Sequence, residues 1–552
     1  MRRLFSPAAA VALFSLFLLT QSASVARAQA YAGKPKLVVI MVIDQFRGDY
    51  LERYRAELKG RGFRLLLDEG AWFPDCYYNY ANTKTAPGHA TIGTGAYTDG
   101  HGIDSNDWWD ASRGYAHKVS SVEDERYRLV DLPNGSRDTT GASPRNLRAS
   151  TLGDELRLAT SGRSRVFGVS LKDRAAILPA GQAANAAYWI DGDSGRFTTS
   201  TYYMEHLPAW ARSFNASDRL AKAAKEAGAD SDAPFSAKIE LSSAANQYEL
   251  EFAEALISGE KLGQDATTDL LTVSLSANDV VGHKYGPDSE QAHQMVLGLD
   301  RDLDGFFGWL DGKIGLKNVW IALSADHGVA PVPATAAALG MNAATVDLRA
   351  LGKNLNDALN AKFSPGKTVN YLLPGADLPY LTLDRRVFEA AGIDEKTAEN
   401  AARAALPEVV AKMAPAAASP SLHRLPATPA VAASYTRLQL ESDGVPQTEF
   451  GRMLAHSYTY HGNWYVMLVL DGYQMQDQHG PGTTHFSPWS YDRHVPLAFY
   501  GAPFQAGTYR GRVEPVDLAA TFASLLGINQ PSASVGRVLT QSLKSDITII
   551  NH

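Results

Sequence analysis

The segment Lys36-Leu37-Val38-Val39-Ile40-Met41-Val42-Ile43-Asp44 is a continuous apolar run that ends in an acidic residue. An apolar run of this length, without polar alternation, is typical of a strand that is buried on both faces of a parallel sheet. The same form recurs at residues 165–171, 270–276, 319–324, 464–470 and 495–500. Helical patterns lie between these runs, such as residues 515–526, which begin with Pro and are followed by Gly527. The sequence therefore predicts an α/β fold in which helices flank a central, mostly parallel sheet.

Polar residues follow several of these predicted strands. Asp44, Lys172, Asp279 and Asp326 each come at or just after the end of an apolar run. In open α/β sheets, ligand sites form beyond the carboxyl ends of the strands. We therefore expect these four side chains to contribute to one site.

The first 30 residues are predicted to be a signal peptide. Arg2 and Arg3 precede a short apolar run at residues 8–20, and two small-residue cleavage patterns end at Ala28 and Ala30. The alternative is a membrane anchor, but the run is shorter than the ~20 residues that a spanning helix needs. We expect cleavage near Ala28 or Ala30 and a periplasmic or secreted protein without stable membrane insertion.

The composition of the chain excludes some classes of protein. The chain has 552 residues and a formal net charge of -7, which argues against a protein that binds duplex nucleic acid or another polyanion. Its single cysteine, Cys76, excludes an internal disulfide framework and a multi-cysteine metal cluster. Residues 31–552 are predicted to form one catalytic domain, with insertions at about 189–265 and 331–460, and no obligate protein partner is evident.

The candidate metal ligands are acidic and histidine residues near the predicted strand ends. They are Asp44, the pair Asp279 and His283, the pair Asp326 and His327, and His485. On one helical turn, a carboxylate and an imidazole four residues apart share a face. Three imidazoles combined with three carboxylates suit a borderline metal such as zinc better than calcium or magnesium. The sequence therefore predicts a metal site at the edge of the sheet.

Two further segments could handle an anionic substrate. Thr85, in Thr85-Ala86-Pro87-Gly88-His89, is placed at a predicted helix amino terminus, where orphan N–H groups favour an anion. Thr85 is either a nucleophile, which metal coordination would activate, or merely a helix cap. If the preceding strand continues through Lys172 and Arg174, these two cations point to one side and could grip a phosphate.

These motifs, together with Asn106, resemble the alkaline phosphatase superfamily. The likeness is greatest to secreted alkaline phosphatases with a threonine nucleophile, and it extends over residues 36–500. It implies an alkaline-phosphatase-like sandwich with inserted cap segments, and two zinc ions. Asp279, His283 and His485 would hold one zinc ion. Asp44, Asp326, His327 and the Thr85 oxygen would hold the other, while Asn106, Lys172 and Arg174 would contact phosphoryl oxygens.

The resemblance implies hydrolysis of phosphate monoesters through a phosphothreonine intermediate on Thr85. A diester carries one charge fewer and a second organic group, so two cations at Lys172 and Arg174 favour the monoester dianion. The alternative enzyme is a phosphodiesterase or nucleotide pyrophosphatase that uses the same two-metal site. Sulfatases and cofactor-independent phosphoglycerate mutases fit less well, and a non-catalytic metal- or phosphate-binding module leaves Thr85 without a role.

Overall fold

The computed structural model describes residues 33–545 except 116, 134–138, 230–234, 236–238, 414–427, 443 and 478–481. The predicted signal peptide, residues 1–30, lies outside the described residues. In the part of the chain that the structure describes, none of the helices is both long and apolar enough to cross a bilayer.

A nine-stranded sheet forms the centre of the molecule. Its strands, in spatial order, are β18 (Gly507–Thr508), β2 (Ala71–Tyr77), β17 (His494–Tyr500), β11 (Val319–Ser324), β1 (Leu37–Ile43), β10 (Asp269–Leu275), β7 (Val166–Ser170), β8 (Ala186–Ile190) and β9 (Phe197–Thr198). Five of the eight neighbouring strand pairs are parallel. The pairs β11–β17, β17–β2 and β8–β9 are antiparallel. The predicted α/β fold with a mostly parallel sheet is confirmed.

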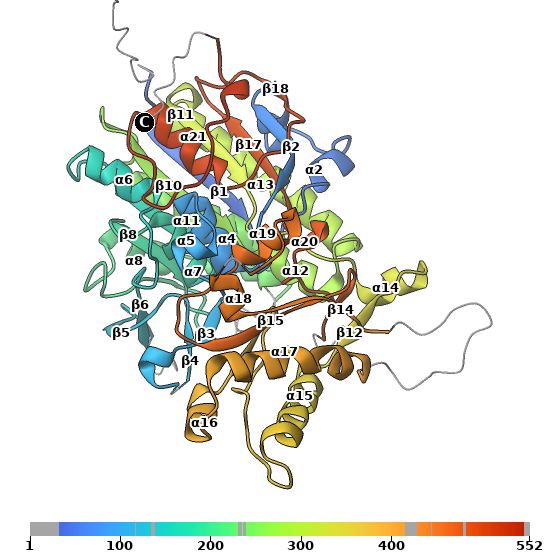
Figure 1. Cartoon of the computed structure of the whole chain (residues 1–552). Helices are drawn as coiled ribbons and strands as arrows, with labels where there is room; N and C mark the ends of the chain where they lie inside the picture. The colour runs from blue at the N-terminus through green and yellow to red at the C-terminus, as the bar shows by residue number, and fades with distance from the viewer. Residues whose placement is uncertain are drawn as a thin grey trace, which may run out of the picture.

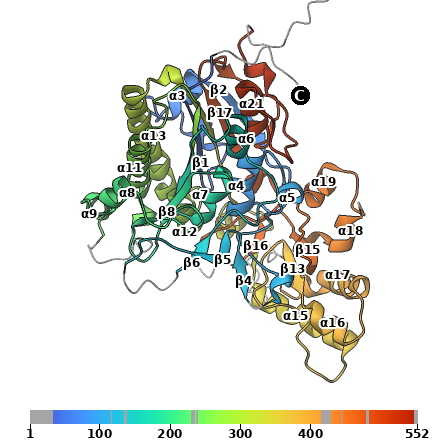
Figure 2. The ribbon, with the colours of Figure 1, turned by 90° about the vertical axis from the view of Figure 1, so that its left-hand side faces the viewer.

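Helices cover both faces of the central sheet, as Figure 2 shows. One layer contains α11 (Ser243–Gly259) and α13 (Glu290–Lys313), which pack against each other. The other contains α4 (Thr85–Thr94), α7 (Asp173–Ala180) and α21 (Asp517–Leu526). Strands β1, β10 and β11 are fully buried between the layers, which is why their sequences are continuously apolar.

One predicted strand belongs to a different sheet. Trp464–Leu470 is a fully buried strand, β15, but it pairs antiparallel with β13 (Tyr380–Leu383) and β14 (Val431–Thr436). The expectation that this run joins the central sheet is therefore wrong. Its length and continuous apolarity match those of the central strands because both of its faces are covered, so the pattern could not identify its neighbours.

We call residues 344–476 the inserted module, because they lie between β11 and β17 in sequence and form sheets of their own. Besides the β13–β15–β14 sheet, strands β12 (Ala344–Val346) and β16 (Gln474–Gln476) pair in parallel. Helices α15 (Leu348–Phe363) and α17 (Glu395–Ala411) pack together over one hydrophobic core. In Figure 1 the module lies below the central sheet, next to the hairpin of β3 (Asp107–Trp109) and β4 (Lys118–Ser120).

Candidate active site

The register of four neighbouring strands brings the candidate residues to one edge of the sheet. Strands β11, β1, β10 and β7 are adjacent and mutually parallel. Ile43 pairs with Leu275, and Val42 pairs with Ser324, so the strands end at nearly the same level. Asp44 follows β1 directly, Asp326 follows β11, and α12 (Ala277–Tyr285) begins just after β10. These segments meet because parallel strands share their carboxyl edge.

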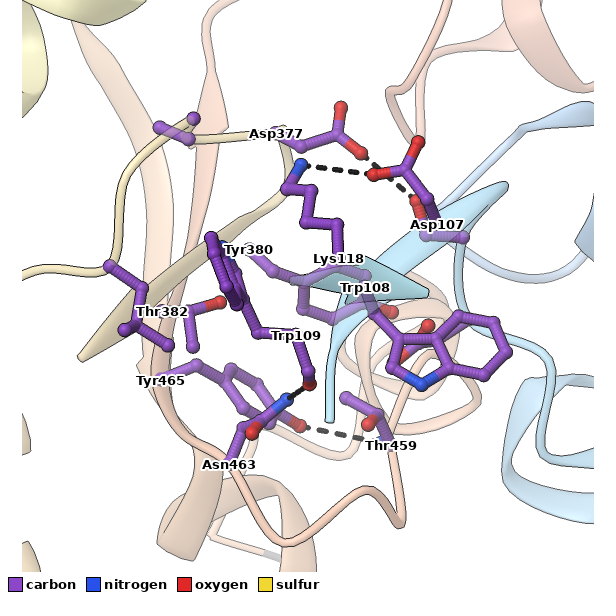
Figure 3. A pocket seen from close by; sticks show the side chains of 15 residues that line it. Asp107, Trp108, Trp109, Lys118, Asp377, Tyr380, Thr382, Thr459, Asn463 and Tyr465 are labelled. Atoms are coloured by element: carbon purple, nitrogen blue, oxygen red, sulfur yellow. Dashed lines mark hydrogen bonds and ion pairs between the residues drawn. The ribbon is translucent and has the colours of Figure 1, made fainter. Parts of the chain in front are cut away.

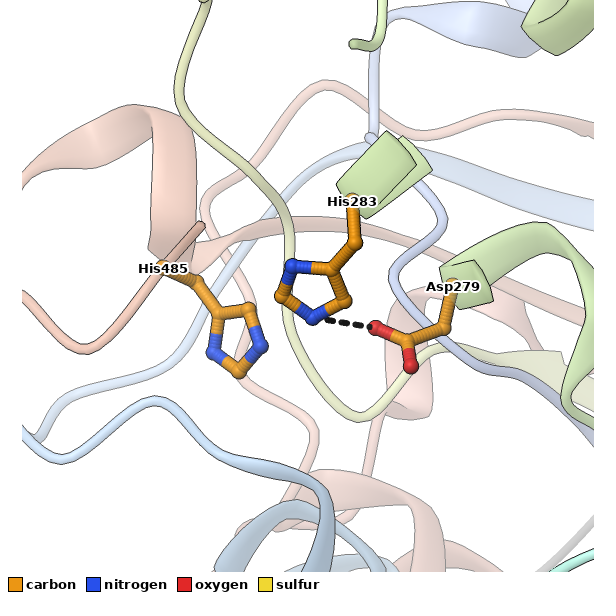
Figure 4. Close-up of side chains that lie close together, drawn as sticks. All are labelled: Asp279, His283 and His485. Atoms are coloured by element: carbon orange, nitrogen blue, oxygen red, sulfur yellow. Dashed lines mark ion pairs between the residues drawn. The ribbon is translucent and has the colours of Figure 1, made fainter. Parts of the chain in front are cut away.

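Asp279, His283 and His485 form the first cluster of possible metal ligands (Figure 4). One ligand atom of each lies within 4.8 Å of the others, and His283 Nε2 lies 3.1 Å from Asp279 Oδ1. The other ring nitrogens contact backbone carbonyls: His283 Nδ1 lies 2.8 Å from the Thr483 oxygen, and His485 Nδ1 lies 2.5 Å from the Thr83 oxygen. Such contacts fix ring orientation and leave Nε2 as the ligand atom.

A second cluster shares Asp279 with the first. Asp44, Asp279 and His327 lie together within 4.8 Å. His327 Nδ1 contacts the Gly328 oxygen at 2.9 Å, which leaves Nε2 facing Asp44 Oδ1 at 3.5 Å and Asp326 Oδ2 at 3.6 Å. Asp326 is therefore adjacent to this cluster, as the resemblance implied, whereas the place of Asp279 in both clusters was not anticipated.

Burial and mutual repulsion determine the protonation of these groups. Burial, followed by the charges of Asp279 and Asp326, raises the pKa of Asp44 well above its ordinary value. Burial lowers the pKa of His327, and it lowers the pKa of His485 well below the ordinary histidine value. Both imidazoles are therefore neutral at physiological pH, and the neutral ring is the form that binds metal.

The residues present fit metal ions. Asp44 Oδ1, Asp326 Oδ2 and His327 Nε2 are buried and have no hydrogen-bond partner among the described residues. A buried polar atom without a partner is unfavourable by about 1–3 kcal/mol, so a ligand that contacts all three atoms would be stabilised in this pocket. Because the atoms are carboxylate oxygens and an imidazole nitrogen, a divalent metal is the ligand that matches them.

Thr85 lies at the amino terminus of a buried helix next to the second cluster. It is the first residue of α4 and is 2% exposed. A methyl group at Gly88 would lie 2.2 Å from the Asp326 carbonyl oxygen, so only glycine allows this close approach. His89 Nδ1 lies 2.8 Å from the Thr85 carbonyl oxygen and 3.3 Å from Asp326 Oδ2. The first turn of α4 is thus held against Asp326.

Asn106 is oriented by the same helix. The Ala86 N–H donates to Asn106 Oδ1 at 2.9 Å, which leaves the Nδ2 group of the amide as the donor for a ligand. Asn106 directly precedes β3 and faces a cavity at the border with the inserted module. The threonine and the asparagine are therefore linked through the backbone of one helical turn.

Lys172 lies between the two clusters. Its Nζ donates to Asp44 Oδ2 at 2.6 Å and to Asp279 Oδ2 at 2.7 Å. Burial opposes the charged form, but Asp279 and Asp44 outweigh it and raise the pKa of Lys172, so the side chain is a permanent cation. Lys172 and Arg174 also line one cleft of about 510 Å3, in which Arg174 pairs with Asp173 at 3.7 Å.

The strand does not continue through these cations. β7 ends at Ser170, and α7 begins at Asp173 with Lys172 as its N-cap residue. Lys172 and Arg174 are therefore not placed on one side by alternation along a strand, and that prediction is wrong. A helical start brings both to the same cleft instead, because the first turn of the helix bends the chain across the edge of the sheet.

Some supporting residues were not identified from the sequence. Gln45 donates from its backbone N–H to Asp326 Oδ1 at 3.0 Å and from Nε2 to Asp279 Oδ1 at 2.7 Å. Gln45 has a φ of 61°, which turns the chain sharply after Asp44. Asn278 Nδ2 donates to the Asp44 carbonyl oxygen at 2.8 Å. Their positions beside Asp44 and Asp279 in the sequence were the available signal.

Comparisons with known proteins agree with this geometry. The type I phosphodiesterase/nucleotide pyrophosphatase family matches residues 38–420. Alkaline phosphatase PhoV of Synechococcus elongatus is 34% identical over 93% of this chain and 93% of its own length. Alkaline phosphatase PafA of Elizabethkingia meningoseptica is 32% identical over 92% of this chain and 94% of its own length. The crystal structure of PafA superposes with a TM-score of 0.81 and covers 93% of this chain and 99% of the PafA chain.

A mutant structure of PafA, at 30% identity and a TM-score of 0.81, covers 93% of this chain and 99% of the PafA chain. It carries substitutions of one threonine, one asparagine, one lysine and one arginine. These residue types have the same order and the same spacing within each pair as Thr85 and Asn106 and as Lys172 and Arg174 here. The extent of the match and the conserved overall fold lead to one conclusion: this chain belongs to the type I phosphodiesterase/nucleotide pyrophosphatase family and is an enzyme of its alkaline phosphatase group.

Proposed function

We propose that the protein is a metal-dependent phosphatase that hydrolyses phosphate monoesters through a phosphothreonine on Thr85. The observation that carries the proposal is the group of buried, unpartnered ligand atoms on Asp44, Asp326 and His327, held beside the first turn of α4. A pocket with these atoms and a threonine at a helix amino terminus is suited to a metal-bound dianion.

Two zinc ions fit the ligands best. One would be held by Asp279, His283 and His485, which all converge within 4.8 Å. The other would be held by Asp44, Asp326, His327 and the Thr85 oxygen. Imidazole nitrogens favour zinc over magnesium or calcium. Bound metal ions would neutralise the dianion and lower the pKa of the threonine hydroxyl.

The chemistry of the protein residues then follows. Thr85 Oγ1 forms a bond to phosphorus while the bond from phosphorus to the alcohol oxygen breaks, and the alcohol leaves with a proton. Water next cleaves the threonine ester and releases inorganic phosphate. Asn106 Nδ2 would donate to a non-bridging oxygen, because its Oδ1 is already engaged by the Ala86 N–H. One such preorganised donor can contribute ~3 kcal/mol to transition-state stabilisation.

Lys172 and Arg174 would select the monoester. Both line the cleft beside the two clusters, and Lys172 stays charged because two carboxylates lie within 2.7 Å of its Nζ. A phosphodiesterase on the same metals is the second candidate, favoured by the phosphodiesterase family match over residues 38–420. A diester replaces one charged oxygen with an organic group, so it gains less from these two cations.

We also propose that the enzyme acts in the periplasm or outside the cell, after removal of the signal peptide near Ala28 or Ala30. The charged start, the short apolar run and the small-residue pattern support this placement. Small phosphate monoesters are its proposed partners.

The decisive experiment combines metal reloading with substrate comparison. Chelated protein should regain p-nitrophenyl phosphate hydrolysis with zinc, and should hydrolyse bis-p-nitrophenyl phosphate more slowly. Alanine at both Lys172 and Arg174 should lower monoester turnover far more than diester turnover. Equal losses would contradict the proposed basis of selectivity, and a faster diester reaction in the parent enzyme would favour the second candidate.

The nucleophile is tested by trapping the phosphoenzyme. Thr85→Val keeps the shape of the side chain but removes its oxygen, so it should abolish the acid-stable phosphothreonine and lower turnover by roughly 10³-fold or more. Thr94→Val is the matched control, because Thr94 lies on the same helix and donates to the Ala90 carbonyl oxygen at 2.7 Å. Labelled Thr85→Val protein would disprove the assignment.

A further inference from the structure

A cavity of about 320 Å3 lies on the inserted-module side of Asn106. The residues that define its chemistry are Lys84, Asn106, Asp107, Lys118, Asp377 and Phe486. An apolar cavity of roughly 150 Å3 is enough to hold a benzene molecule, so this space accommodates a ring with room for substituents. Because Asn106 and the residue before Thr85 both border it, the cavity is placed to receive the organic group of a substrate.

The charges that line the cavity are balanced. Lys84 Nζ lies 2.6 Å from Asp377 Oδ2, and both groups bond to Ser105 Oγ at 2.9 Å. Lys118 Nζ lies 3.1 Å from Asp107 Oδ1, as Figure 3 shows beside Asp377. Each cation therefore has its own carboxylate, and the cavity offers no net charge to a second anionic group. A neutral organic group suits it better than another phosphate or carboxylate.

Phe486 forms an aromatic wall of this cavity. Its ring centroid is 4.2 Å from that of His485, so it borders the first cluster directly. Lys84 Nζ lies 4.8 Å from the ring centroid on one side, and the Phe486 N–H donates to Thr83 Oγ1 at 3.2 Å. The φ of Phe486 is 94°, a value that bulky residues rarely adopt. Strain of this kind persists where the surrounding contacts hold a side chain in a particular position.

The neighbouring tryptophan pocket is too small for the same purpose. Trp108 and Trp109 line an adjacent space of about 30 Å3, which shares Lys118 with the cavity. That volume holds about one or two water molecules and no aromatic ring. Among the described residues that border the cavity beside Asn106, Phe486 is the aromatic side chain.

We propose that this cavity is the subsite for the organic group of the phosphate monoester, and that Phe486 makes it selective for neutral aromatic groups. The inference rests on the proposed phosphomonoesterase function and adds the substrate class. An aromatic ring that packs on Phe486 gains contact beyond simple burial of its area, typically enough for a two- to tenfold preference. A methyl group has no ring to pack against Phe486 and should not gain this preference.

The test uses inhibitors that cannot react, so that only binding is measured. In zinc-loaded enzyme, phenylphosphonate should inhibit about three- to tenfold more strongly than methylphosphonate. Phe486→Leu, which keeps Cβ and the strained backbone, should reduce that ratio to about one, while Phe486→Tyr should retain it. Inhibition by inorganic phosphate should be unchanged in Phe486→Leu, because phosphate has no organic group.

Trp109→Leu is the matched control, since Trp109 lies outside the cavity. It should keep the inhibitor ratio of the parent enzyme. The subsite is wrong if Phe486→Leu keeps the ratio or if Trp109→Leu abolishes it. Failure of the subsite and failure of the proposed function can be told apart. If the parent enzyme does not hydrolyse monoesters, the proposed function is wrong. If it hydrolyses them and Phe486→Leu keeps the inhibitor ratio, only the subsite is wrong.

Discussion

A buried carboxyl group of the inserted module and the buried ligand atoms at the edge of the central sheet differ in their hydrogen bonding. In the module, Glu399 is fully buried, and its carboxylate accepts from the Leu438 and Tyr465 backbone N–H groups at 3.2 Å. At the sheet edge, Asp44 Oδ1 and His327 Nε2 are equally buried, yet no described residue bonds to them. The first arrangement ties a helix to neighbouring segments. The second leaves donor atoms open for ligands at the expense of stability.

The largest effect on activity should come from removing a histidine that is predicted to bind metal. His327→Ala or His485→Ala should lower metal content and reduce kcat/KM by at least about 10³-fold, because each removes a ligand from a buried metal site. Metal analysis and kinetics on p-nitrophenyl phosphate would measure both effects. Fold should be retained, as judged by circular dichroism, because neither Nε2 atom holds the protein together.

His101 supplies the control for this comparison. It is also buried, but Nε2 contacts Thr91 Oγ1 at 3.2 Å and Nδ1 accepts from the Ile103 N–H at 3.1 Å. Burial lowers its pKa to about 3, so the ring is neutral and structural. His101→Ala should lower the unfolding midpoint while metal content stays normal. If His101→Ala lost metal, or if His327→Ala kept its full metal content, the distinction between a structural and a metal-binding histidine would be wrong.

A smaller effect is expected where the two regions meet. Lys84 is 1% exposed and pairs with Asp377 of the inserted module, so Asp377→Asn leaves a buried charge without its partner. We expect a loss of about 3 kcal/mol in unfolding free energy, the low end for a buried pair because Asp377 is 28% exposed. Because Lys84 directly precedes Thr85, kcat should fall about tenfold.

Urea denaturation and steady-state kinetics would measure these two quantities. The exposed pair Lys353 and Asp357, also 2.6 Å apart, is the control within the module. Asp357→Asn should change stability by less than about 0.5 kcal/mol. If Asp377→Asn and Asp357→Asn lost similar amounts of unfolding free energy, burial would not explain the difference expected between the two ion pairs. The double variant Lys84→Met/Asp377→Leu should recover stability, because no unpaired charge remains.

The smallest effect concerns the satisfied carboxyl group of the module. Burial raises the pKa of Glu399 to about 8 from its ordinary value of 4.5, although two backbone N–H bonds oppose the shift. Between these pH values the unfolded chain has released a proton that the folded protein still holds. The stabilising contribution is therefore complete below pH 4.5 and is lost as pH rises toward 8.

Glu399→Gln has no proton to release, so its unfolding free energy should depend less on pH across this window. Denaturation midpoints at pH 5, 7 and 9 would measure the difference between the two proteins. Glu395 and Arg437 form an ion pair at 2.6 Å near this site. Parallel pH profiles for the parent and the variant would show that Glu399 does not titrate there.

Apolar runs predicted several strands of the central sheet, but they did not predict which strands pair with one another. β1, β7, β10, β11 and β17 correspond to predicted runs. β2 was not predicted, since Ala71–Tyr77 contains Pro74 and Asp75, which interrupt the apolar pattern. Trp464–Leu470 was predicted as a strand but lies in another sheet. Periodicity reports burial along one segment, and strand pairing depends on segments far away in the sequence.

The sequence predicted those site residues whose side-chain type and spacing already indicate metal binding. Asp279 and His283 are four residues apart on one helix, and that spacing already places them together. Lys172 and Arg174 converge for a different reason than alternation suggested, because a helix begins at Asp173. Gln45 was overlooked, since a glutamine side chain carries no signal until the carboxylates that it bonds are in position.

The amino-acid sequence by itself determined the α/β class, the helix that begins at Thr85, and the types of ligand atom at the strand ends. These depend on local periodicity and side-chain chemistry, which the order of residues fixes directly. Only the tertiary structure decided that Asp279 belongs to two clusters, that Lys172 lies between them, and that the inserted module covers Asn106 with Phe486 at its border. Such relations arise from contacts across hundreds of residues, where packing of whole layers sets the distances.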